Sequence, residues 1–594
     1  MKPYAELRAI MAERGLDAFV LPRSDAYLNE DLAPADERLL WLTGFTGSVG
    51  LVVIGHEQGA LLVDGRYTAQ AQRECGGHLE ILALDDASLF LWLEKHLEAG
   101  ACIGCDPTLH SIDEYSRWQQ LSVDYGFAWR DVADNPVEAV WWERPAPPAT
   151  PVMAQPLEYA GISAADKLAQ LTEQLLAADC SALWLPAPDM LAWLLNVRAQ
   201  DIAIAPLPFS CAVLHASGEL DWFIDAQRLQ LPPDWLPPTV NVRPQAELAL
   251  MIQALGQADL VRVWLDRTSC NAAVYRQFQH AGWLIHEAPN PVLLARACKP
   301  EVQLQGVREA HVLDGLALCR FLHEYETHCE RFVGQSELAV VESLARWRGL
   351  HGDYRGVSFD TIAAAGANGA QPHYLPKPGQ AAKLKRGELL LIDSGGQYPQ
   401  GTTDVTRVLA CSAPSVRQRY LYTTVLRAHI ALASCMFPKG TSGQQLDNVA
   451  RQVMWREGLD YAHGTGHGVG SYLNVHEGPQ RIAPQASKVA LQEGMVTSIE
   501  PGVYLPGELG IRIENLYEVV PAPGYPGFLG FRVLTLAPLS GELIERDLLT
   551  AAEAQWLDGY QWQVWATLAP LLEPPVARWL QRQTSPNNLL FGGQ

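Results

Sequence analysis

Four acidic residues form two matched pairs in the second half of the 594-residue sequence. Asp393 ends the apolar run Leu389–Ile392, and Asp404 follows eleven residues later. Glu500 also follows an apolar run, and Glu514 comes shortly after it, so the second pair repeats the first at separations of 107 and 110 residues. Such a duplication predicts two half-domains related by a pseudo-twofold axis, with four carboxylates at their shared centre.

A cluster of four buried carboxylates is strongly destabilising unless the groups are protonated or neutralised by cations, because like charges repel in a poorly polar interior. A pair of metal ions is the simplest solution. Each acid taken singly could be an ordinary turn or capping residue. Two matched pairs, each beside a strand, favour the metal site instead.

Three histidines lie between the acidic pairs. His463 and His467 are four residues apart in a glycine-rich segment, and His476 follows nine residues later. A helical zinc site of the HExxH type is excluded, because no Glu follows His463 and because Gly464 and Gly466 disfavour a stable helix. In such a tight segment one imidazole can reach a metal ion while another faces a substrate.

Four carboxylates and one imidazole form an oxygen-rich donor set. It suits Mn²⁺, Co²⁺ or Zn²⁺ in a two-metal centre better than it suits a thiolate zinc site. Two ions roughly 3.5–4 Å apart can share a water molecule, lower its pKa and stabilise a tetrahedral intermediate, so the predicted chemistry is hydrolysis. No cluster of Lys and Arg surrounds these motifs to hold a phosphate. An amide substrate is therefore favoured over a phosphate ester.

The composition limits the possible binding partners of the protein and indicates its cellular compartment. The formal net charge of −22 disfavours nucleic acid and anionic membranes, which are bound through clustered Lys and Arg. Residues 1–20 lack the unbroken apolar stretch of a secretory signal, and no run of about 18 apolar residues predicts a membrane span. The 11 cysteines are scattered and odd in number, which suits reduced thiols in a cytoplasm. The single CxxC pair, Cys102 and Cys105, supplies two thiolates, which are too few for a four-thiolate zinc site.

The length predicts about three to five domains at roughly 100–200 residues each. A proline-rich stretch, 145–151, predicts a linker near residues 143–157. The segments on either side resemble each other at an offset of 164 residues, where Ala18–Leu21 corresponds to Ala182–Leu185. We therefore predict two copies of one α/β domain, residues 1–143 and 157–298, in which helices alternate with short buried strands.

A third region begins at residue 299, where apolar residues recur at helical spacing between Val307 and Phe321 and predict a long amphipathic helix. Dense strand signals follow, and we assign residues 299–534 to the domain that carries both acidic pairs. The last segment, 535–594, is rich in aromatic residues in helical patterns: Trp556, Trp562, Trp565 and Trp579. We expect this segment to be a packed extension rather than a solvated tail.

Five motifs in this order resemble those of the metallo-aminopeptidase family with the pita-bread fold: Leu391–Gly395, Gly401–Arg407, His463–Gly470, Ile499–Gly502 and Arg512–Asn515. The three-domain length, the Asn474–Pro479 segment and the aromatic tail resemble most closely the long, cytosolic Xaa-Pro aminopeptidases of that family. Gly44–Ser48 and Asp64–Tyr67 extend the resemblance into the first domain. It implies an α/β fold with two related creatinase-like domains, a duplicated α+β catalytic domain and a C-terminal extension.

The resemblance also implies a dinuclear metal centre, with Mn²⁺ as the first expectation and Co²⁺ or Zn²⁺ as alternatives. Its ligands would be Asp393, Asp404, His467, Glu500 and Glu514. Asp404 and Glu514 would bridge the two ions.

Further residues are implied on the substrate side. His373, within Gly366–Tyr374, resembles the substrate-side histidine of the family. His463 and His476 would flank the bound peptide, either donating to the scissile carbonyl oxygen or holding the proline side. Arg66 resembles an arginine of the first domain that reaches a neighbouring active site in the long members.

The implied reaction is attack on the peptide carbonyl before a penultimate proline by a hydroxide that bridges the two metal ions. One ion would bind the free α-amino group and the other would polarise the carbonyl, with Glu500 as the candidate proton shuttle. A tertiary amide at proline lacks an N–H, which explains the need for a dedicated enzyme. The expected partner is a peptide with proline in second position, and the resemblance further implies a cytoplasmic homodimer.

Three alternatives remain. A prolidase-like Xaa-Pro dipeptidase uses the same five ligands, but the duplicated N-terminal half and the tail favour an aminopeptidase. A methionine aminopeptidase is disfavoured because two whole domains precede the catalytic region. A non-catalytic peptide- or protein-binding relative is a third alternative, against which the intact ligand set argues.

Overall fold

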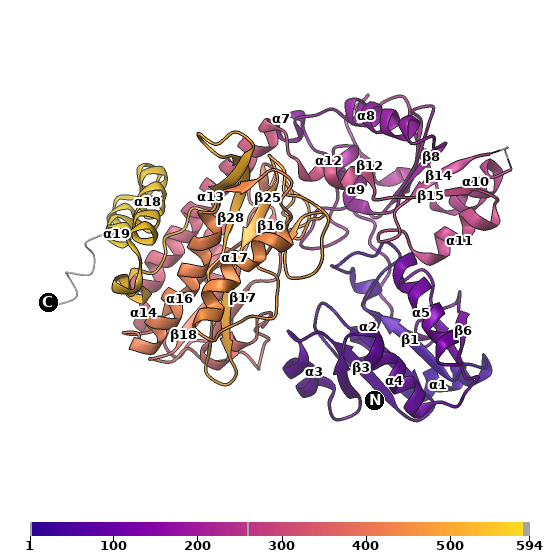
Figure 1. The fold of residues 1–594 in the computed structure, drawn as a ribbon, viewed down its shortest axis with the longest axis horizontal. Helices are drawn as coiled ribbons and strands as arrows, with labels where there is room; N and C mark the ends of the chain where they lie inside the picture. The colour runs from indigo at the N-terminus through magenta and orange to yellow at the C-terminus, as the bar shows by residue number, and fades with distance from the viewer. Residues whose placement is uncertain (1–2, 258–259, 586–594) are drawn as a thin grey trace. The chain divides into compact units, whose positions relative to one another are not determined.

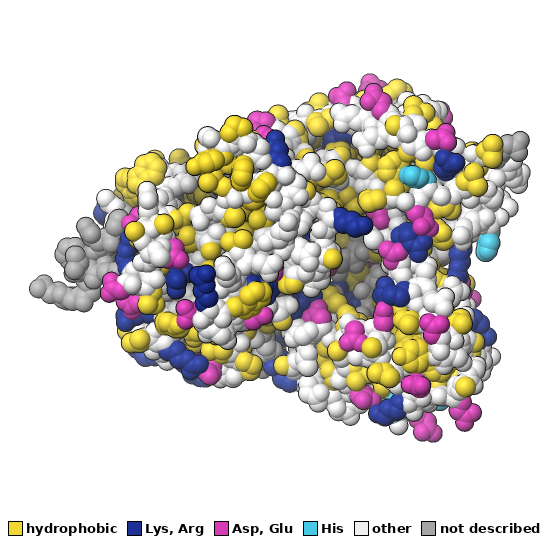
Figure 2. Space-filling model, viewed as in Figure 1, with side chains coloured by type: hydrophobic (Ala, Val, Ile, Leu, Met, Phe, Trp, Pro, Cys, Tyr) yellow, Lys and Arg dark blue, Asp and Glu magenta, His cyan; other side chains and the backbone are white. Residues whose placement is uncertain are grey.

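The computed structural model describes residues 3–257 and 260–585. The chain divides into two compact units (Figure 1). The first unit comprises residues 1–155 and 162–293, and the second comprises residues 156–161 and 294–594. On the face shown in Figure 2, Lys and Arg side chains are interspersed with Asp and Glu. No described helix is long and apolar enough to span a membrane.

The first unit contains two six-stranded sheets of the same topology. The first has the order β4-β3-β2-β1-β5-β6 and the second the order β13-β11-β10-β8-β14-β15. In each sheet the central strand, β1 or β8, pairs antiparallel with one neighbour and parallel with the other. The strands of the first are β1 (Ala18–Pro22), β2 (Leu51–Gly55), β3 (Gly59–Val63), β4 (Glu80–Ala83), β5 (Cys102–Cys105) and β6 (Ala128–Asp131). Those of the second are β8 (Ala182–Leu185), β10 (Cys211–His215), β11 (Leu220–Phe223), β13 (Val240–Arg243), β14 (Arg262–Leu265) and β15 (Leu284–Glu287).

These matching sheets confirm the two related α/β domains, because β1 and β8 begin at the predicted offset. The helices of this unit are α1 (Tyr4–Glu13), α2 (Arg38–Thr43), α3 (Thr68–Cys75), α4 (Asp86–His96), α5 (Ile112–Asp124), α6 (Pro136–Val140), α8 (Ala164–Ala177), α9 (Pro188–Leu194), α10 (Leu248–Leu255) and α11 (Ala272–His280). Leu7 and Met11, one turn apart on α1, are buried in the core of the first sheet. Helix α12 (Pro291–Ala297) leads from this unit into the second.

The proline-rich stretch differs in one respect from the predicted linker. Residues 145–151 form neither helix nor strand, but β7 (Val152–Ala154) pairs with β9 (Val197–Arg198) and β12 (Leu229–Gln230) in a small sheet of the first unit. The strand fits because Pro151 precedes it and Pro156 follows it, so neither proline removes a donor from the ladder. Pro156 instead precedes α7 (Leu157–Ala160).

The second unit contains the sheets that carry the acidic pairs. One has the order β17-β18-β21 and another the order β22-β29-β28-β25, and all their pairings are antiparallel. Their strands are β17 (Ile362–Ala365), β18 (Leu389–Ser394), β21 (Val405–Ala410), β22 (Phe437–Pro438), β25 (Val496–Ile499), β28 (Asn515–Pro521) and β29 (Phe528–Val533). Shorter strands complete the unit: β16 (Gly356–Val357), β19 (Gly396–Tyr398), β20 (Gly401–Thr402), β23 (Gly466–His467), β24 (Arg481–Ile482), β26 (Gly502–Leu505) and β27 (Leu509–Arg512).

The strand pairing reproduces the predicted duplication. In β18 and β21, Asp393 lies opposite Thr406. In β25 and β28, Ile499 lies opposite Asn515, so that each pair has one acid at the end of its first strand and one just before its second. This is the duplicated α+β arrangement that the sequence predicts.

Helices flank these sheets (Figure 1) and share one hydrophobic core with them. They are α13 (Glu301–Thr327), α14 (Cys329–Phe332), α15 (Glu337–Gly349), α16 (Val416–Ala433), α17 (Gly443–Arg456), α18 (Ala551–Leu568) and α19 (Pro574–Thr584). The long helix predicted from residue 301 is α13. Leu557, Val564 and Leu568 of α18 are buried in the same core, which confirms a packed C-terminal extension for its described residues. Residues 586–594 lie outside the described ones.

The CxxC pair has no geometry for a shared bond or metal ion. Cys102 and Cys105 both lie on β5, three residues apart, so their side chains point to opposite faces of the strand. All the cysteines are free thiols. Burial raises the pKa of both CxxC thiols, which disfavours the reactive thiolate.

Candidate metal centre

The four paired acids and His467 converge in the second unit. One ligand atom each from Asp404, His467 and Glu514 lie within 4.8 Å of one another. His467 Nε2 is 3.5 Å from Asp404 Oδ2 and 3.6 Å from Glu500 Oε1. The negative charges of Asp404 and Glu500 also raise the pKa of Asp393. The structure therefore brings together all five residues predicted as metal ligands.

Local structure explains how His467 reaches this position. Its strand β23 lies against β25, where the His467 amide donates to Ser498 Oγ over 3.0 Å. Ser498 Oγ in turn donates to Glu500 Oε1 over 3.1 Å. A Cβ atom at Gly466 would overlap the carbonyl oxygen of Ser498, so only glycine permits this approach.

The tautomer of His467 leaves the lone pair of Nε2 available to bind a cation. Its Nδ1 lies 2.9 Å from the carbonyl oxygen of Gly468, so Nδ1 carries the hydrogen and donates it. The lone pair of Nε2 then faces the carboxylate oxygens of Asp404 and Glu500, which are themselves acceptors. A cation between these three acceptors turns a repulsive contact into coordination.

The acids carry strongly perturbed pKa values because they are buried together. Burial raises the pKa of Asp393 to about 7, although the Arg512 guanidinium opposes this shift. Burial and the charges of Asp404, Glu500 and Asp393 raise the pKa of Glu514 well above its usual value. Burial also acts to raise the pKa of Glu500, but His467, His463 and Arg512 outweigh it and the net shift is downward. Buried acids whose negative charges repel one another in this way favour the binding of positive ions.

Two oxygens of the cluster accept no hydrogen bond from the described residues. They are Asp393 Oδ1 and Asp404 Oδ1, and both are buried. Leaving a buried charged acceptor unsatisfied costs at least about 1–3 kcal/mol, so such atoms mark a missing partner. The donor set of four carboxylates and one imidazole nitrogen, with two open oxygens, fits divalent metal ions.

Arg512 and Tyr504 belong to the centre, although neither was assigned a role from the sequence. Arg512 donates to Asp393 Oδ2 over 2.6 Å and to the Tyr504 hydroxyl over 2.7 Å. Arg512 lies within a recognised motif, and its position two residues before Glu514 was the available signal. Tyr504 had no comparable signal, because its role depends on how β26 pairs with β27.

His463 is held in one tautomer by this network. Its Nδ1 donates to the carbonyl of Gly464 over 2.7 Å, so its Nε2 accepts from the Tyr504 hydroxyl over 2.8 Å. Burial lowers the pKa of His463 to about 4, so the ring is neutral. The ring of His476 lies at 83° to that of His467 with centroids 4.4 Å apart, which places His476 beside the ligands.

Helix α17 supports the segment that carries these histidines. Arg451 donates to the carbonyl oxygens of Tyr461 and His463, each over 2.7 Å. The Thr465 hydroxyl donates to Asp447 Oδ1 over 2.6 Å. This support was not predicted, because Asp447 and Arg451 look like ordinary helix residues in the sequence.

His373 lies in a turn that follows a short 3₁₀ helix, Gly366–Ala370. The buried carboxylate of Glu337 fixes both ends of this loop: it accepts from the amides of Ala365 and Ala382, each over 2.7 Å. It also accepts from the hydroxyl of Tyr374, the neighbour of His373, over 2.8 Å. Glu337 was not predicted, since an acid in the first turn of α15 resembles an ordinary helix-start residue.

Arg66 belongs to the first unit, where it forms a two-pronged ion pair with Asp64. Its guanidinium also lies over the ring of Tyr67, 5.5 Å from the centroid. The predicted role of Arg66 at a neighbouring active site stays a prediction.

Comparison with known protein families divides the chain into four matched segments. Residues 4–128 and 143–303 each match the creatinase/prolidase N-terminal domain. Residues 305–521 match metallopeptidase family M24, and residues 527–587 match the C-terminal region of peptidase M24.

Curated relatives match the chain over nearly its whole length. A probable Xaa-Pro aminopeptidase P of Coccidioides posadasii is 35% identical, with 98% of each chain covered. Aminopeptidase P1 of Lotus japonicus is 33% identical at the same coverage of both chains.

Solved structures give a consistent result. X-prolyl aminopeptidase from Caenorhabditis elegans, described as a cytosolic enzyme with a di-nuclear active site, matches with a TM-score of 0.92 and 32% identity. That match covers 98% of this chain and 99% of the other. A Xaa-Pro dipeptidase from Bacillus anthracis shares the fold over 64% of this chain, at 23% identity and a TM-score of 0.51.

Proposed function

The chain belongs to metallopeptidase family M24, within its Xaa-Pro aminopeptidase P group, and we propose that it removes the N-terminal residue from peptides whose second residue is proline. The observation that carries this proposal is the convergence of four strand-end carboxylates and His467 at one buried centre. The relatives that share the chain's full length, and not only its second unit, are Xaa-Pro aminopeptidases. This full-length match favours the aminopeptidase over the dipeptidase alternative.

We infer that Asp393, Asp404, His467, Glu500 and Glu514 hold two divalent metal ions, with Mn²⁺ as the resident metal and Co²⁺ or Zn²⁺ as alternatives. The oxygen-rich donor set, the open Oδ1 atoms of Asp393 and Asp404 and the tautomer of His467 support this assignment. When bound, such ions supply Lewis acidity and activate a water molecule. The positions of Asp404 and Glu514 within one group of ligand atoms support their role as bridging ligands.

Glu500 is the proposed proton shuttle. Despite burial, the Arg512 guanidinium helps to hold its pKa below the usual value, so its carboxylate is ionised and able to accept a proton at neutral pH. It then takes a proton from the attacking water and returns it to the proline nitrogen of the leaving peptide. Its hydrogen bond from Ser498 Oγ keeps the carboxylate aligned.

Three histidines are proposed to orient the peptide. His476 lies beside the ligands, and His463 is neutral and bound to Tyr504. Tyr504 accepts from Arg512 and donates its hydrogen to His463, so the His463 ring and the Tyr504 hydroxyl are held in a fixed orientation. His373 would contact the substrate from the loop that Glu337 holds, and Arg66 would contribute to specificity from the first unit.

The test is release of the N-terminal residue from an Arg-Pro-Pro peptide, with and without added Mn²⁺. The unaltered protein should release free arginine and should lose activity after chelation. Asp404→Ala should abolish activity, because it removes an acid from the group of close ligand atoms. Asp547→Ala, at an exposed acid of the same unit, is the matched control and should retain it.

Two outcomes would overturn the proposal. Hydrolysis of an Xaa-Pro dipeptide but not of the longer peptide would identify a dipeptidase. Absence of bound transition metal together with absence of Mn²⁺-stimulated hydrolysis would identify a peptide-binding relative.

We further propose that the protein is a cytoplasmic homodimer. The description of the C. elegans neighbour as cytosolic and the free thiols support the compartment. The mass of the purified chain at micromolar concentration tests the homodimer, and a value near 65.3 kDa would refute it.

A further inference from the structure

Arg407 is a buried cation whose hydrogen-bond acceptors include no carboxylate in the described part of the chain. It lies on β21, three residues after Asp404, and only 4% of its surface is exposed. Its guanidinium donates to main-chain carbonyls, one amide oxygen and one phenol: those of Thr406, Glu514, Ala537, Pro538, Asn515 and Tyr560. These contacts use all five N–H groups of the guanidinium. Arg407 therefore links several segments of the chain, and we call it a structural joint.

One side of this joint is the strand that carries Glu514. Arg407 Nη1 donates to the main-chain oxygen of Glu514 over 2.8 Å, and Nη2 donates to Asn515 Oδ1 over 2.8 Å. The preceding residue, Thr406, donates from its hydroxyl to Glu514 Oε2 over 2.7 Å. Thr406 and Arg407 together therefore hold both the main chain and the carboxylate of Glu514.

The other side of the joint is the C-terminal extension. Arg407 donates to the carbonyl of Ala537 over 2.8 Å and to the hydroxyl of Tyr560, on α18, over 2.8 Å. The Tyr560 hydroxyl donates to the same Ala537 carbonyl over 2.6 Å. Tyr560 thus closes a three-membered ring of hydrogen bonds with Arg407 and Ala537, 153 residues along the chain from Arg407.

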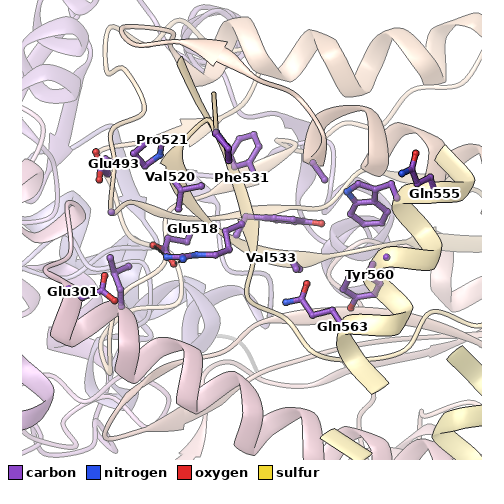
Figure 3. Close-up of a pocket in the computed structure, with 18 residues that line it drawn as sticks. Glu301, Glu493, Glu518, Val520, Pro521, Phe531, Val533, Gln555, Tyr560 and Gln563 are labelled. Carbon is purple, nitrogen blue, oxygen red and sulfur yellow. Dashed lines mark hydrogen bonds and ion pairs between the residues drawn. The ribbon is translucent and has the colours of Figure 1, made fainter. Parts of the chain in front are cut away.

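The ring of Tyr560 is buried in the core of the second unit and also lines a cavity. The cavity has a volume of about 760 Å³ and lies between α18 and the strands β28 and β29. Figure 3 shows Tyr560 there, together with Gln563 and Val533. Trp556 stacks on the ring at 5.6 Å and 9°. The stack and the surrounding core hold the ring, so removal of the hydroxyl perturbs its hydrogen bonds specifically.

We propose that Arg407 and Tyr560 are positioning residues through which the C-terminal extension fixes Glu514 in the metal centre. Tyr560 orients the Arg407 guanidinium, Arg407 holds the main chain at Glu514 and Asn515, and Glu514 presents its carboxylate to the metal ions. The acceptors of Arg407 are carbonyl, amide and phenol oxygens, so the joint adds no further carboxylate beside the four acids of the cluster. This inference rests on the proposed metal centre.

The test compares Tyr560→Phe with Gln561→Leu. Tyr560→Phe keeps the ring and the Trp556 stack and removes only the hydroxyl. Gln561 also joins α18 to the preceding segment, through two hydrogen bonds with the main chain of Leu539, but has no bond to Arg407 or Asn515. Gln561→Leu therefore controls for looser docking of the helix.

Mn²⁺ affinity by titration calorimetry, kcat, KM and the thermal midpoint are measured for each variant. Tyr560→Phe should weaken Mn²⁺ binding about tenfold and lower kcat with little change in KM, as expected when an outer support of a metal ligand is lost. Gln561→Leu should lower the thermal midpoint but leave Mn²⁺ affinity within about twofold of the unaltered protein.

A second variant tests whether Tyr560 acts on Glu514 through Arg407. Arg407→Lys keeps the charge but not the fan of hydrogen bonds, and it should weaken Mn²⁺ binding more than Tyr560→Phe does. Adding Tyr560→Phe to Arg407→Lys should then cause no further loss, because Tyr560 acts through Arg407. If Arg407→Lys does not fold, Tyr560→Phe and Gln561→Leu decide the question.

The inference fails if Tyr560→Phe binds Mn²⁺ as the unaltered protein does, or if Gln561→Leu weakens binding equally. Its failure is distinguishable from failure of the proposed function, because unaltered protein that binds no Mn²⁺ refutes the metal centre itself.

Discussion

Arg512 donates a hydrogen bond of 2.6 Å to Asp393 Oδ2 and so joins the two duplicated halves of the second unit. Asp393 is the penultimate residue of β18 in the first half, and Arg512 ends β27 in the second half. The same guanidinium reaches Tyr504 and the hydroxyl of Thr406. One cation therefore aligns an expected metal ligand, the hydroxyl that orients His463 and the residue that holds Glu514.

Arg512→Lys should lower kcat/KM by about 10- to 100-fold. A lysine ammonium places its three N–H donors on one nitrogen and cannot span Asp393 and Tyr504 as the planar guanidinium does. Arg532→Lys, at a half-exposed arginine paired with Glu518, is the matched control and should leave hydrolysis unchanged. Equal activity of the Arg512→Lys and Arg532→Lys proteins would show that the bridge is dispensable.

Gly466→Ala should destabilise the second unit and abolish hydrolysis. Its Cβ would overlap the carbonyl oxygen of Ser498, so β23 must move away from β25 and take His467 with it. Thermal unfolding and the Mn²⁺ content of the purified protein measure the effect. Gly541→Ala serves as the control, since no atom lies near its added methyl group; similar behaviour of the two variants would refute the close-approach argument.

Glu337→Gln should raise KM for a proline peptide about tenfold, with Mn²⁺ affinity little changed. The carboxylate accepts from Ala365, Ala382 and Tyr374, and an amide group in its place turns one acceptor into a donor. The loop that carries His373 then loses its anchor, whereas the metal ligands keep theirs. Glu342→Gln, at an exposed position of the same helix, should behave as the unaltered protein does. A fall in Mn²⁺ affinity without a change in KM would contradict this assignment.

The sequence predicts the acidic metal ligands but not the residues that position them, and the reason is physical. Asp393 and Glu500 each stand at the end of an apolar run, which is a local pattern that a strand imposes on its own residues. The spacing to the next acid is also local, because short connections join these strands. Duplication then predicts that the two pairs meet. Each of these steps uses neighbours in the chain.

The supports depend on tertiary packing. Tyr560 meets Arg407 only because α18 packs on the sheet. Glu337 meets Ala382 only because the chain returns to the start of α15 after β16 and β17. No local pattern marks a tyrosine or a glutamate for such a contact. The strand Val152–Ala154 was missed for a related reason, since flanking prolines obscured a ladder whose partners lie far along the chain.

His429 should make the metal-free protein sensitive to mild acid. Burial and the charge of Arg407 lower its pKa to about 3, and the ring is neutral between the carbonyl of Ile513 and the Tyr517 hydroxyl. A depressed pKa contributes stability that is present above the unfolded value of about 6.5 and is lost as the pH falls toward 3. Between pH 7 and pH 5 this group should cost about 2 kcal/mol of unfolding free energy.

His429→Gln removes the titrating group, while its side-chain oxygen can still accept from Tyr517. The variant should therefore be less stable than the unaltered protein at pH 7, but its stability should fall less between pH 7 and pH 5. Urea unfolding of both metal-free proteins at the two pH values measures this difference. His280→Gln, at an exposed histidine of the first unit, should leave the pH dependence as it is. If His429→Gln and the unaltered protein lose equal stability between pH 7 and pH 5, then protonation of His429 does not drive the acid sensitivity of this unit.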